Sequence, residues 1–354
     1  MIKINYKGIV LEKRWGIDFE ANGVLNPGCI LVDGVTYMFY RAVNKENVSS
    51  IGCCHLKKGK VIFQSIGPVI FPEFEYEKRG VEDPRITFLD DKYYLLYTAY
   101  DGKNATVAMA TSTDLVHFRK EGVIIPKISY DEAEDIFRLK TKLNPRYNFF
   151  EKVYRSINGD NVLLWEKDVV LFPQRINGQI AMLHRILPGI QLITFDQWEN
   201  LNIDYWKKYL AELDKHIVLD PVGGFESAYV GAGCVPIETE LGWLLIYHSV
   251  EIKNNNKIYR ASIALLDKKD PRKVLKRLPY PLFEPKKSWE KEKRMRADAK
   301  KKRANKRKKA RNHKKIKQNA LHSNAVTPLK QYARKEIKVE KAAKAVKAVK
   351  TAKA

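Results

Sequence analysis

Two stretches of sequence decide the fold: CILVDGVTYMFYRAV at residues 29–43 and ITFLDDKYYLLYTAY at residues 86–100. In each, two runs rich in β-branched and aromatic residues flank a tight polar turn, DG at 33–34 and DD at 90–91. Paired runs around such a turn are typical of β-hairpins. Each stretch therefore predicts two adjacent antiparallel strands.

The same pattern returns at residues 169–186 and 233–250. Pro27 and Pro84, which open the first two units, are 57 residues apart, a length that suits one four-stranded blade. Repeated all-β units of this size predict a β-propeller. A β-sandwich with similar hairpins remains open on periodicity alone. The propeller is favoured because unusual polar residues fall at equivalent strand starts and ends, where blades converge on a channel.

Two segments interrupt the strand pattern. Residues 127–166 form a charged insertion whose DEAEDIFRLKTKL run predicts a helix. Residues 195–213, FDQWENLNIDYWKKYLAEL, have apolar positions near helical spacing and are predicted to be partly helical.

The charge divides the chain into a neutral body and a basic tail. The formal net charge is +24, but residues 286–354 carry 27 Lys and Arg against 5 Asp and Glu, leaving 38 basic and 36 acidic residues in 1–285. We therefore predict a folded domain at 1–285 and a disordered or helical basic tail at 286–354. The tail could bind polyanions through phosphate contacts, be a solvated extension, or replace the native C-terminus through a frameshift or fusion.

Cellular context follows from what the sequence lacks. The N-terminal run MIKINYKGIVLEKRW has no apolar signal-peptide core, and no stretch reaches the roughly 20 apolar residues that span a bilayer. The four cysteines have no metal-ligand spacing and are expected to be reduced. We expect a cytoplasmic protein without membrane or metal.

The most informative polar motif is GVEDPR at residues 80–85. Two adjacent acids, Glu82 and Asp83, open a strand that otherwise has a core composition. Neighbouring strand side chains face opposite sides, so the two acids should have different roles. Burial raises the pKa of a carboxyl group and pairing with Arg85 lowers it. The balance of the two can set the pKa for acid catalysis of glycosidic cleavage. An ion pair that only fixes the strand is the alternative.

Further polar residues fall at matching blade ends. Each taken singly is explained as well by a turn, a salt bridge or a core histidine, but together they would form a pocket for a sugar and an anion. They are Asn26, Arg41, Asp101, Lys167, Asp168, Arg185, Glu226 and His248.

Several segments in order resemble glycoside hydrolase family 130. The similarity covers roughly residues 20–289 and is carried by NPG, FYRA, GVEDPRI, LLYTAYDG, ATSTDL, KDVVLFPQRINGQIAMLHR, GAGCVPIETELGWLLIYHSV and PYPLFEP. The resemblance implies a five-bladed β-propeller that acts on β-mannosides, as a phosphorylase or as a hydrolase. The lysines after residue 285 replace the family's last strands, so the last blade is predicted to be incomplete.

The resemblance also implies roles for residues. The acid of the EDPR motif falls on Asp83, which would protonate the departing oxygen, relayed through a sugar hydroxyl. Inorganic phosphate would be the nucleophile and co-substrate, with no other cofactor, and the product would be α-mannose 1-phosphate, formed with inversion from a manno-oligosaccharide or mannosyl-N-acetylglucosamine. Phosphate would bind at Arg41, Lys167 and Arg185, and the sugar at Asn26, Arg85, Asp101 and His248.

Two other functions remain open. Thr106 stands where many relatives have an arginine, which favours hydrolysis with Asp168 or Glu226 as the base that activates water. A non-catalytic, sugar-binding propeller with a polyanion-binding tail is the alternative from another class. An exposed edge of an incomplete blade could also pair with a second copy, so a homo-oligomer stays open.

Overall fold

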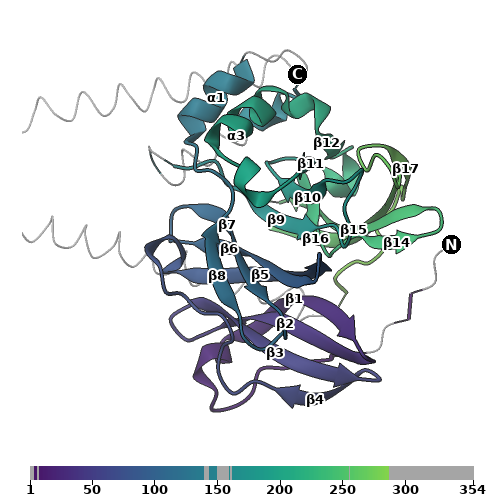
Figure 1. The fold of residues 1–354 in the computed structure, drawn as a ribbon. Helices are drawn as coiled ribbons and strands as arrows, with labels where there is room; N and C mark the ends of the chain where they lie inside the picture. The colour runs from purple at the N-terminus through teal and green to yellow at the C-terminus, as the bar shows by residue number, and fades with distance from the viewer. Residues whose placement is uncertain are drawn as a thin grey trace, which may run out of the picture. The chain divides into compact units, whose positions relative to one another are not determined.

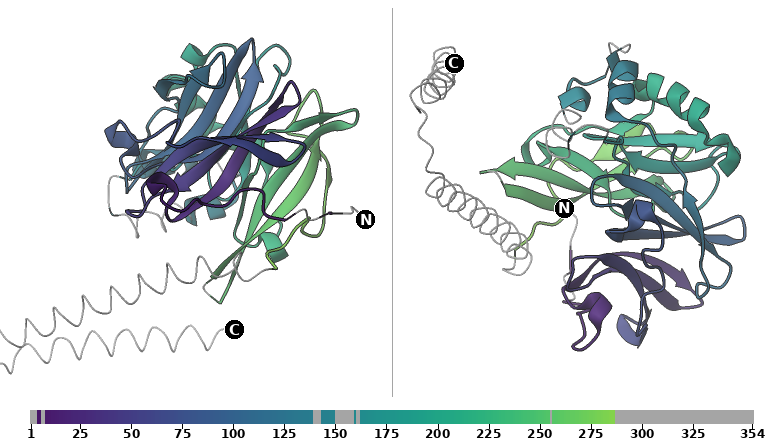
Figure 2. Two further views of the ribbon diagram at one scale, coloured as in Figure 1. Left: turned by 90° about the horizontal axis from the view of Figure 1, so that it is seen from below. Right: turned by 90° about the vertical axis from the view of Figure 1, so that its left-hand side faces the viewer.

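The computed structural model describes residues 4–5, 8–138, 143–149, 159, 162–254 and 256–286. The chain divides into two units, Met1–Pro285 and Lys286–Ala354, and everything below concerns the first unit (Figures 1 and 2). The predicted basic tail and incomplete last blade fall almost entirely after residue 286. They lie outside the described residues and stay predictions.

The first two four-stranded units share one sheet. They are joined by a single parallel pair, Ser49 with Gly80. Within each unit all neighbouring strands are antiparallel. The strands are β1 (Gly23–Val32), β2 (Val35–Val43), β3 (Ser49–Lys57) and β4 (Lys60–Gln64), then β5 (Gly80–Leu89), β6 (Lys92–Tyr100), β7 (Ala105–Ser112) and β8 (Arg119–Val123).

The third and fourth units are separate antiparallel sheets. The third has the order β12-β11-β10-β9 and the fourth the order β13-β15-β16-β17, with β14 pairing β15 from the side. The strands are β9 (Lys167–Leu171), β10 (Ile180–Arg185), β11 (Ile190–Phe195) and β12 (Ile217–Leu219), then β13 (Tyr229–Ala232), β14 (Ile237–Thr239), β15 (Gly242–Lys253), β16 (Asn256–Leu266) and β17 (Val274–Arg277).

Helices are few in the described residues. Both predicted helical segments are confirmed in part, by α1 (Tyr130–Arg138) and α3 (Ile203–Ala211); the end of the first predicted segment lies outside the described residues. No helix in the described ranges combines the length and the apolar character needed to cross a bilayer. Residues 146–149 are helical too. Single 3₁₀ turns are η1 (Asp18–Glu20), η2 (Glu75–Glu77), η3 (Trp198–Asn200), η4 (Leu213–Lys215) and η5 (Gly224–Glu226).

The innermost strands of the four units lie side by side in chain order. β1 contacts β5, β5 contacts β9, and β9 contacts β13. The predicted mostly-β architecture is therefore confirmed, and the arrangement of its sheets is propeller-like (Figure 1). Each inner strand brings its first residues to a common region, and this region holds the candidate site.

Three of the predicted hairpins are confirmed with their turns. Asp33, Asp90 and Asn177 adopt positive φ angles of 48°, 48° and 50°, as short polar residues in tight turns can. The fourth predicted hairpin is also confirmed, by β14 and β15. The inner strand of that unit is β13, Tyr229–Ala232, which precedes the hairpin.

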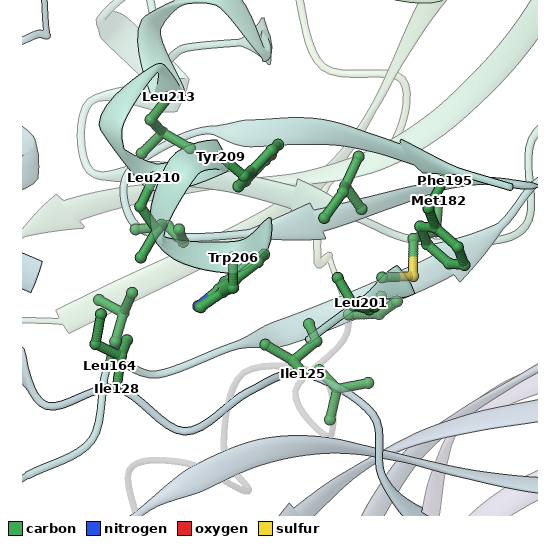
Figure 3. Packing of buried hydrophobic residues seen from close by; sticks show 14 of the residues in the cluster. Ile125, Ile128, Leu164, Met182, Phe195, Leu201, Trp206, Tyr209, Leu210 and Leu213 are labelled. Carbon is green, nitrogen blue, oxygen red and sulfur yellow. The ribbon is translucent and has the colours of Figure 1, made fainter. Parts of the chain in front are cut away.

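Helix α3 covers the third sheet. Its side chains at Trp206, Tyr209 and Leu210 are buried at helical spacing and belong to the same hydrophobic cluster as Met182 and Phe195 of the strands (Figure 3). The Asn202 side chain caps the helix by accepting a hydrogen bond from the Tyr205 N–H at 3.0 Å. Helix α3 thus belongs to the core of the third unit.

A buried glutamate recurs in three of the four units. It ends the 3₁₀ turn three residues before the inner strand, is fully buried, and accepts a hydrogen bond from a tyrosine of the second strand. The tyrosine Oη to glutamate distances are 3.2, 3.1 and 2.6 Å. A cation pairs with each glutamate as well. The sets are Glu20 with Tyr40 and Arg14, Glu77 with Tyr97 and Lys120, and Glu226 with Tyr247 and Arg277.

Candidate active site

The candidate site is built on three equivalent bulges. Asn26 in β1, Asp83 in β5 and Asp168 in β9 have positive φ angles of 47°, 53° and 56°. At each of them the pairing with the second strand of the unit shifts register. A bulge turns a side chain away from the regular alternation, and Asn and Asp tolerate the left-handed conformation it needs.

Asp83 lies between the first and second units. Its Oδ1 accepts hydrogen bonds from Asn26 Nδ2 at 2.8 Å and from Arg41 Nη1 at 3.2 Å. The strands approach closely here, because a Cβ added to Gly28 would lie 2.5 Å from the carbonyl oxygen of Pro84. The glycine of the NPG motif therefore allows the contact between Asn26 and Asp83.

Arg41 joins both acids of the EDPR motif. Its Nη2 donates to Glu82 Oε1 at 2.7 Å, and its Nε donates to Ser49 Oγ at 2.9 Å. Lys167 Nζ lies 3.4 Å from the other oxygen of Glu82. We expected Glu82 and Asp83 to face opposite sides. The left-handed bulge at Asp83 breaks the alternation, so both carboxyl groups reach the same guanidinium group.

The charges around Asp83 lower its pKa. Burial alone would raise the pKa, but Arg41, Lys167 and Arg85, together with the Asn26 hydrogen bond, lower it to about 2. Burial lowers the pKa of Lys167, but the charges of Glu82 and Asp83 raise it by more, so the net shift is upward. In the unliganded protein Asp83 is a carboxylate and Lys167 an ammonium group at neutral pH.

A second group of charges lies across β9, β10 and β15. Arg185 Nη1 pairs with Asp168 Oδ2 at 2.6 Å and lies 3.2 Å from His248 Nε2. Gly231 of β13 makes room for both partners, since a Cβ there would lie 2.3 Å from Asp168 Oδ2 and 2.8 Å from His248 Nε2. Burial, Arg185 and Arg85 lower the pKa of His248 to about 4 against the effect of Asp168. His248 is therefore a neutral imidazole that accepts from Arg185.

The two groups form one continuous set of charges. Lys167 and Arg185 are opposite each other in the β9–β10 pairing. The pKa of Lys167 responds to Asp83 on one side and to Arg185 on the other, and that of His248 responds to Asp83 as well. Aromatic rings border both cations, Trp165 at 5.8 Å from Lys167 Nζ and Tyr229 at 5.2 Å from Arg185 Cζ.

Most predicted site residues meet in this region. Those that come together are Asn26, Arg41, Asp83, Arg85, Lys167, Asp168, Arg185 and His248. Arg85 Nη1 donates to the Pro84 carbonyl oxygen at 2.8 Å. Its charge lowers the pKa of Asp83 and that of His248. Within the described part of the chain, no three His, Cys, Asp or Glu side chains are grouped so as to hold a metal ion.

Three residues named from the sequence lie outside this group. Asp101 Oδ1 accepts from the backbone N–H groups of Lys103 and Asn104, both at 2.6 Å, and so holds the loop after β6. Thr106 is buried in β7, and no residue of the described chain hydrogen-bonds its hydroxyl group. Glu226 is one of the three recurring buried glutamates, and its partners leave it no access to a water molecule. A role for Glu226 as a base does not fit this position.

Sequence reasoning missed the recurring glutamates although a signal was present. Glu20 and Glu77 are 57 residues apart, as are Tyr40 and Tyr97, which is the same spacing that Pro27 and Pro84 show. Because each of these carboxyl groups is fully buried and hydrogen-bonded, we assign them a structural role.

Comparisons with known proteins match this chain to one family. A family model for glycoside hydrolase family 130, described as beta-1,4-mannooligosaccharide phosphorylase, matches residues 9–292. A 1,2-beta-oligomannan phosphorylase of Thermoanaerobacter sp. (strain X514) is 32% identical over 301 residues, covering 82% of this chain and 84% of the relative. A beta-1,2-mannobiose phosphorylase of the same organism is 31% identical, covering 79% and 80%.

A solved structure shows the same fold. The beta-1,2-mannobiose phosphorylase of Listeria innocua, in complex with beta-1,2-mannobiose, superposes with a TM-score of 0.56 at 22% identity, over 80% of this chain and 84% of that chain. With the family match over most of the length, these findings confirm the resemblance drawn from the motifs. The chain belongs to glycoside hydrolase family 130 and is an enzyme of the glycoside phosphorylase or glycosidase kind.

Proposed function

We propose that this chain catalyses phosphorolysis of a β-mannoside, with inorganic phosphate as the nucleophile and α-mannose 1-phosphate as the product. The observation that carries the proposal is the placement of one carboxyl group, Asp83, in a continuous set of charges that includes Arg41, Lys167 and Arg185. A carboxyl group can protonate a leaving oxygen, and a group of cations can hold an anion beside it.

The proposed step balances with one acid. The bond between the anomeric carbon and the glycosidic oxygen breaks, and a bond from that carbon to a phosphate oxygen forms. Asp83 gives its proton to the departing oxygen. Phosphate supplies the electron pair, so no second carboxyl group has to activate water as it would in an inverting hydrolase. Attack opposite the leaving group converts the β-linkage into the α-phosphate.

The low pKa of Asp83 in the unliganded protein has to change before catalysis. With a pKa of about 2 the group is ionised at neutral pH, whereas an acid must carry a proton. Phosphate bound among Arg41, Lys167 and Arg185 would add negative charge and offset the cations that lower this pKa. We therefore propose that phosphate binding raises the pKa of Asp83, so that its carboxyl group takes up a proton from solution.

We further propose that the substrate is a short β-1,2-linked manno-oligosaccharide bound at Asn26, Arg85 and His248, without a cofactor beyond phosphate. Support comes from relatives over about four fifths of the chain whose names specify β-1,2-linked mannosides. The description of the family model specifies the β-1,4 linkage instead. The β-1,4-linked and mannosyl-N-acetylglucosamine substrates therefore belong in the same test.

The test is to incubate the full chain with each oligosaccharide, with and without phosphate, and to measure mannose 1-phosphate and free mannose. We expect mannose 1-phosphate only in the presence of phosphate. Free mannose formed at the same rate without phosphate would reject phosphorolysis in favour of hydrolysis, where Asp168 is the remaining candidate base. Binding without turnover of any substrate would leave the non-catalytic alternative.

A further inference from the structure

The third unit ties its inner strand to the second strand in a different way from the other three. Its buried carboxylate is Glu166, 2% exposed, which directly precedes β9. Glu166 Oε2 lies 2.8 Å from His184 Nδ1, and His184 Nε2 lies 2.6 Å from Tyr209 Oη. His184 thus takes the place of the second-strand tyrosine, and Tyr209 of helix α3 adds a third member. We call this chain of contacts, Glu166–His184–Tyr209, the link.

Helix α3 fixes the outer end of this link. The Tyr209 ring stacks on Trp206, with ring centroids 5.1 Å apart and an interplanar angle of 13° (Figure 3). The Tyr209 hydroxyl also donates to the Leu192 carbonyl oxygen of β11 at 3.2 Å. His184 is itself fully buried against these rings. The link therefore joins β9, β10 and β11 to the helix through buried side chains.

Glu166 and His184 are each directly followed by a cation of the candidate site. Glu166 precedes Lys167, and His184 precedes Arg185. Two of the second-strand tyrosines also precede a residue of the site, because Tyr40 precedes Arg41 and Tyr247 precedes His248. Neighbouring strand residues face opposite sides, so a rotation that displaces the buried residue also displaces the cation after it.

Backbone pairing alone does not hold this segment of β9 and β10. The register shifts between Leu183 and Arg185, opposite the bulge at Asp168. The ladder is thus irregular directly beside the pair that Lys167 and Arg185 form. The link from Glu166 to His184 spans the same two strands beside the irregularity. Without His184, the buried Glu166 carboxyl group would lose its hydrogen-bond partner on β10, which disfavours the present arrangement of the two strands.

We propose that Glu166, His184 and Tyr209 are positioning residues for inorganic phosphate, which hold Lys167 and Arg185 at the spacing that the anion requires. This inference rests on the proposed function, in which those two cations bind phosphate. Loosening the link should weaken phosphate binding, while the proton transfer from Asp83 and the binding of the sugar continue.

The test compares Tyr209→Phe with Tyr97→Phe in the full chain. Tyr97→Phe also removes one buried hydroxyl group, which donates to Glu77, but Thr98 follows Tyr97 in the strand and no cation of the site does. We expect Tyr209→Phe to raise the KM for phosphate about tenfold while kcat and the KM for the sugar change less than about twofold. Tyr97→Phe should lower Tm to a similar extent and leave the KM for phosphate unchanged.

Variants at Glu166 give a second measurement. Glu166→Gln keeps an oxygen that can accept a hydrogen bond and should retain more phosphate affinity than Glu166→Ala. Two outcomes would overturn the positioning role alone. One is an equal KM for phosphate in Tyr209→Phe and Tyr97→Phe; the other is an equal rise of the KM for phosphate and the KM for the sugar in Tyr209→Phe. A wild-type enzyme that needs no phosphate would overturn the proposed function and this inference together.

Discussion

Replacement of Asp83 by Asn tests the proposed chemistry with little change of shape. Asn is compatible with the left-handed conformation at this bulge, because Asn26 has a φ of 47° at the equivalent place in β1. The amide oxygen can still accept from Asn26 and Arg41. The substitution therefore removes the negative charge and the transferable proton but preserves the backbone and most contacts.

The structure gives the size of the effect on folding. The pKa of Asp83 falls from 3.8 to about 2 on folding, which corresponds to about 2 kcal/mol. Because the folded-state pKa is the lower one, this contribution is present above about pH 4 and is lost as the pH falls towards 2. We expect Asp83→Asn to lower the free energy of unfolding at pH 7 by about 2 kcal/mol, measured by guanidinium denaturation.

The effect on catalysis depends on the leaving group. With an oligosaccharide, loss of the acid should lower kcat by about 10²–10⁴-fold. With a dinitrophenyl β-mannoside, whose leaving group needs no proton, the loss should be less than about tenfold. Mannose 1-phosphate release from both substrates measures the difference. Asp91→Asn is the matched control, since Asp91 also has a positive φ, 58°, but lies in an exposed hairpin turn.

Equal losses on both substrates would refute proton donation by Asp83 and leave it a role in binding. An unchanged rate on the oligosaccharide would remove Asp83 from the mechanism altogether. An unfolding free energy at pH 7 that does not change would refute the favourable pairing of the carboxylate with the surrounding cations.

Three further outcomes follow from the same geometry. Phosphate binding should be accompanied by proton uptake at Asp83, seen by titration calorimetry in buffers of different ionisation enthalpy; binding heats independent of the buffer would contradict this. Gly231→Ala should displace Asp168 and cost about 1–3 kcal/mol of stability together with activity, whereas Gly67→Ala, with nothing within 4 Å of the added carbon, should cost neither. Trp206→Ala should lower the unfolding free energy by about 3–5 kcal/mol in denaturant titrations, because the side chain is fully buried; a loss below about 1 kcal/mol would contradict its place in the core.

Local signals explain why most strands could be predicted from the sequence. The hairpin turns at Asp33, Asp90 and Asn177 combine residues that tolerate positive φ with flanking runs rich in apolar strand-forming residues, and both signals lie within a few residues. Strand β13, Tyr229–Ala232, has only four residues, two of them Gly231 and Ala232, so it carries no such pattern. Its identity as an inner strand follows only from its long-range pairing with β15.

The site could be predicted in part for a similar reason. Asp83, Arg41 and Lys167 lie at ends of strands that the repeat aligned, and the fold brings them together. The shared contact of Glu82 and Asp83 with Arg41 could not be predicted, because alternation fails at a left-handed residue. The structural role of Glu226 was missed because its burial comes from Arg277 and Tyr247, which are distant in sequence.

The three bulges restrict which chemistry each inner strand can present. A left-handed position with its side chain turned into the centre admits, at low strain, little besides Asn, Asp and Gly. The polar side chain at positions 26, 83 and 168 is therefore restricted to an amide or a carboxyl group, as in Asn26, Asp83 and Asp168. An exchange of Asn and Asp at any of the three positions is a single-residue change that needs no new backbone conformation.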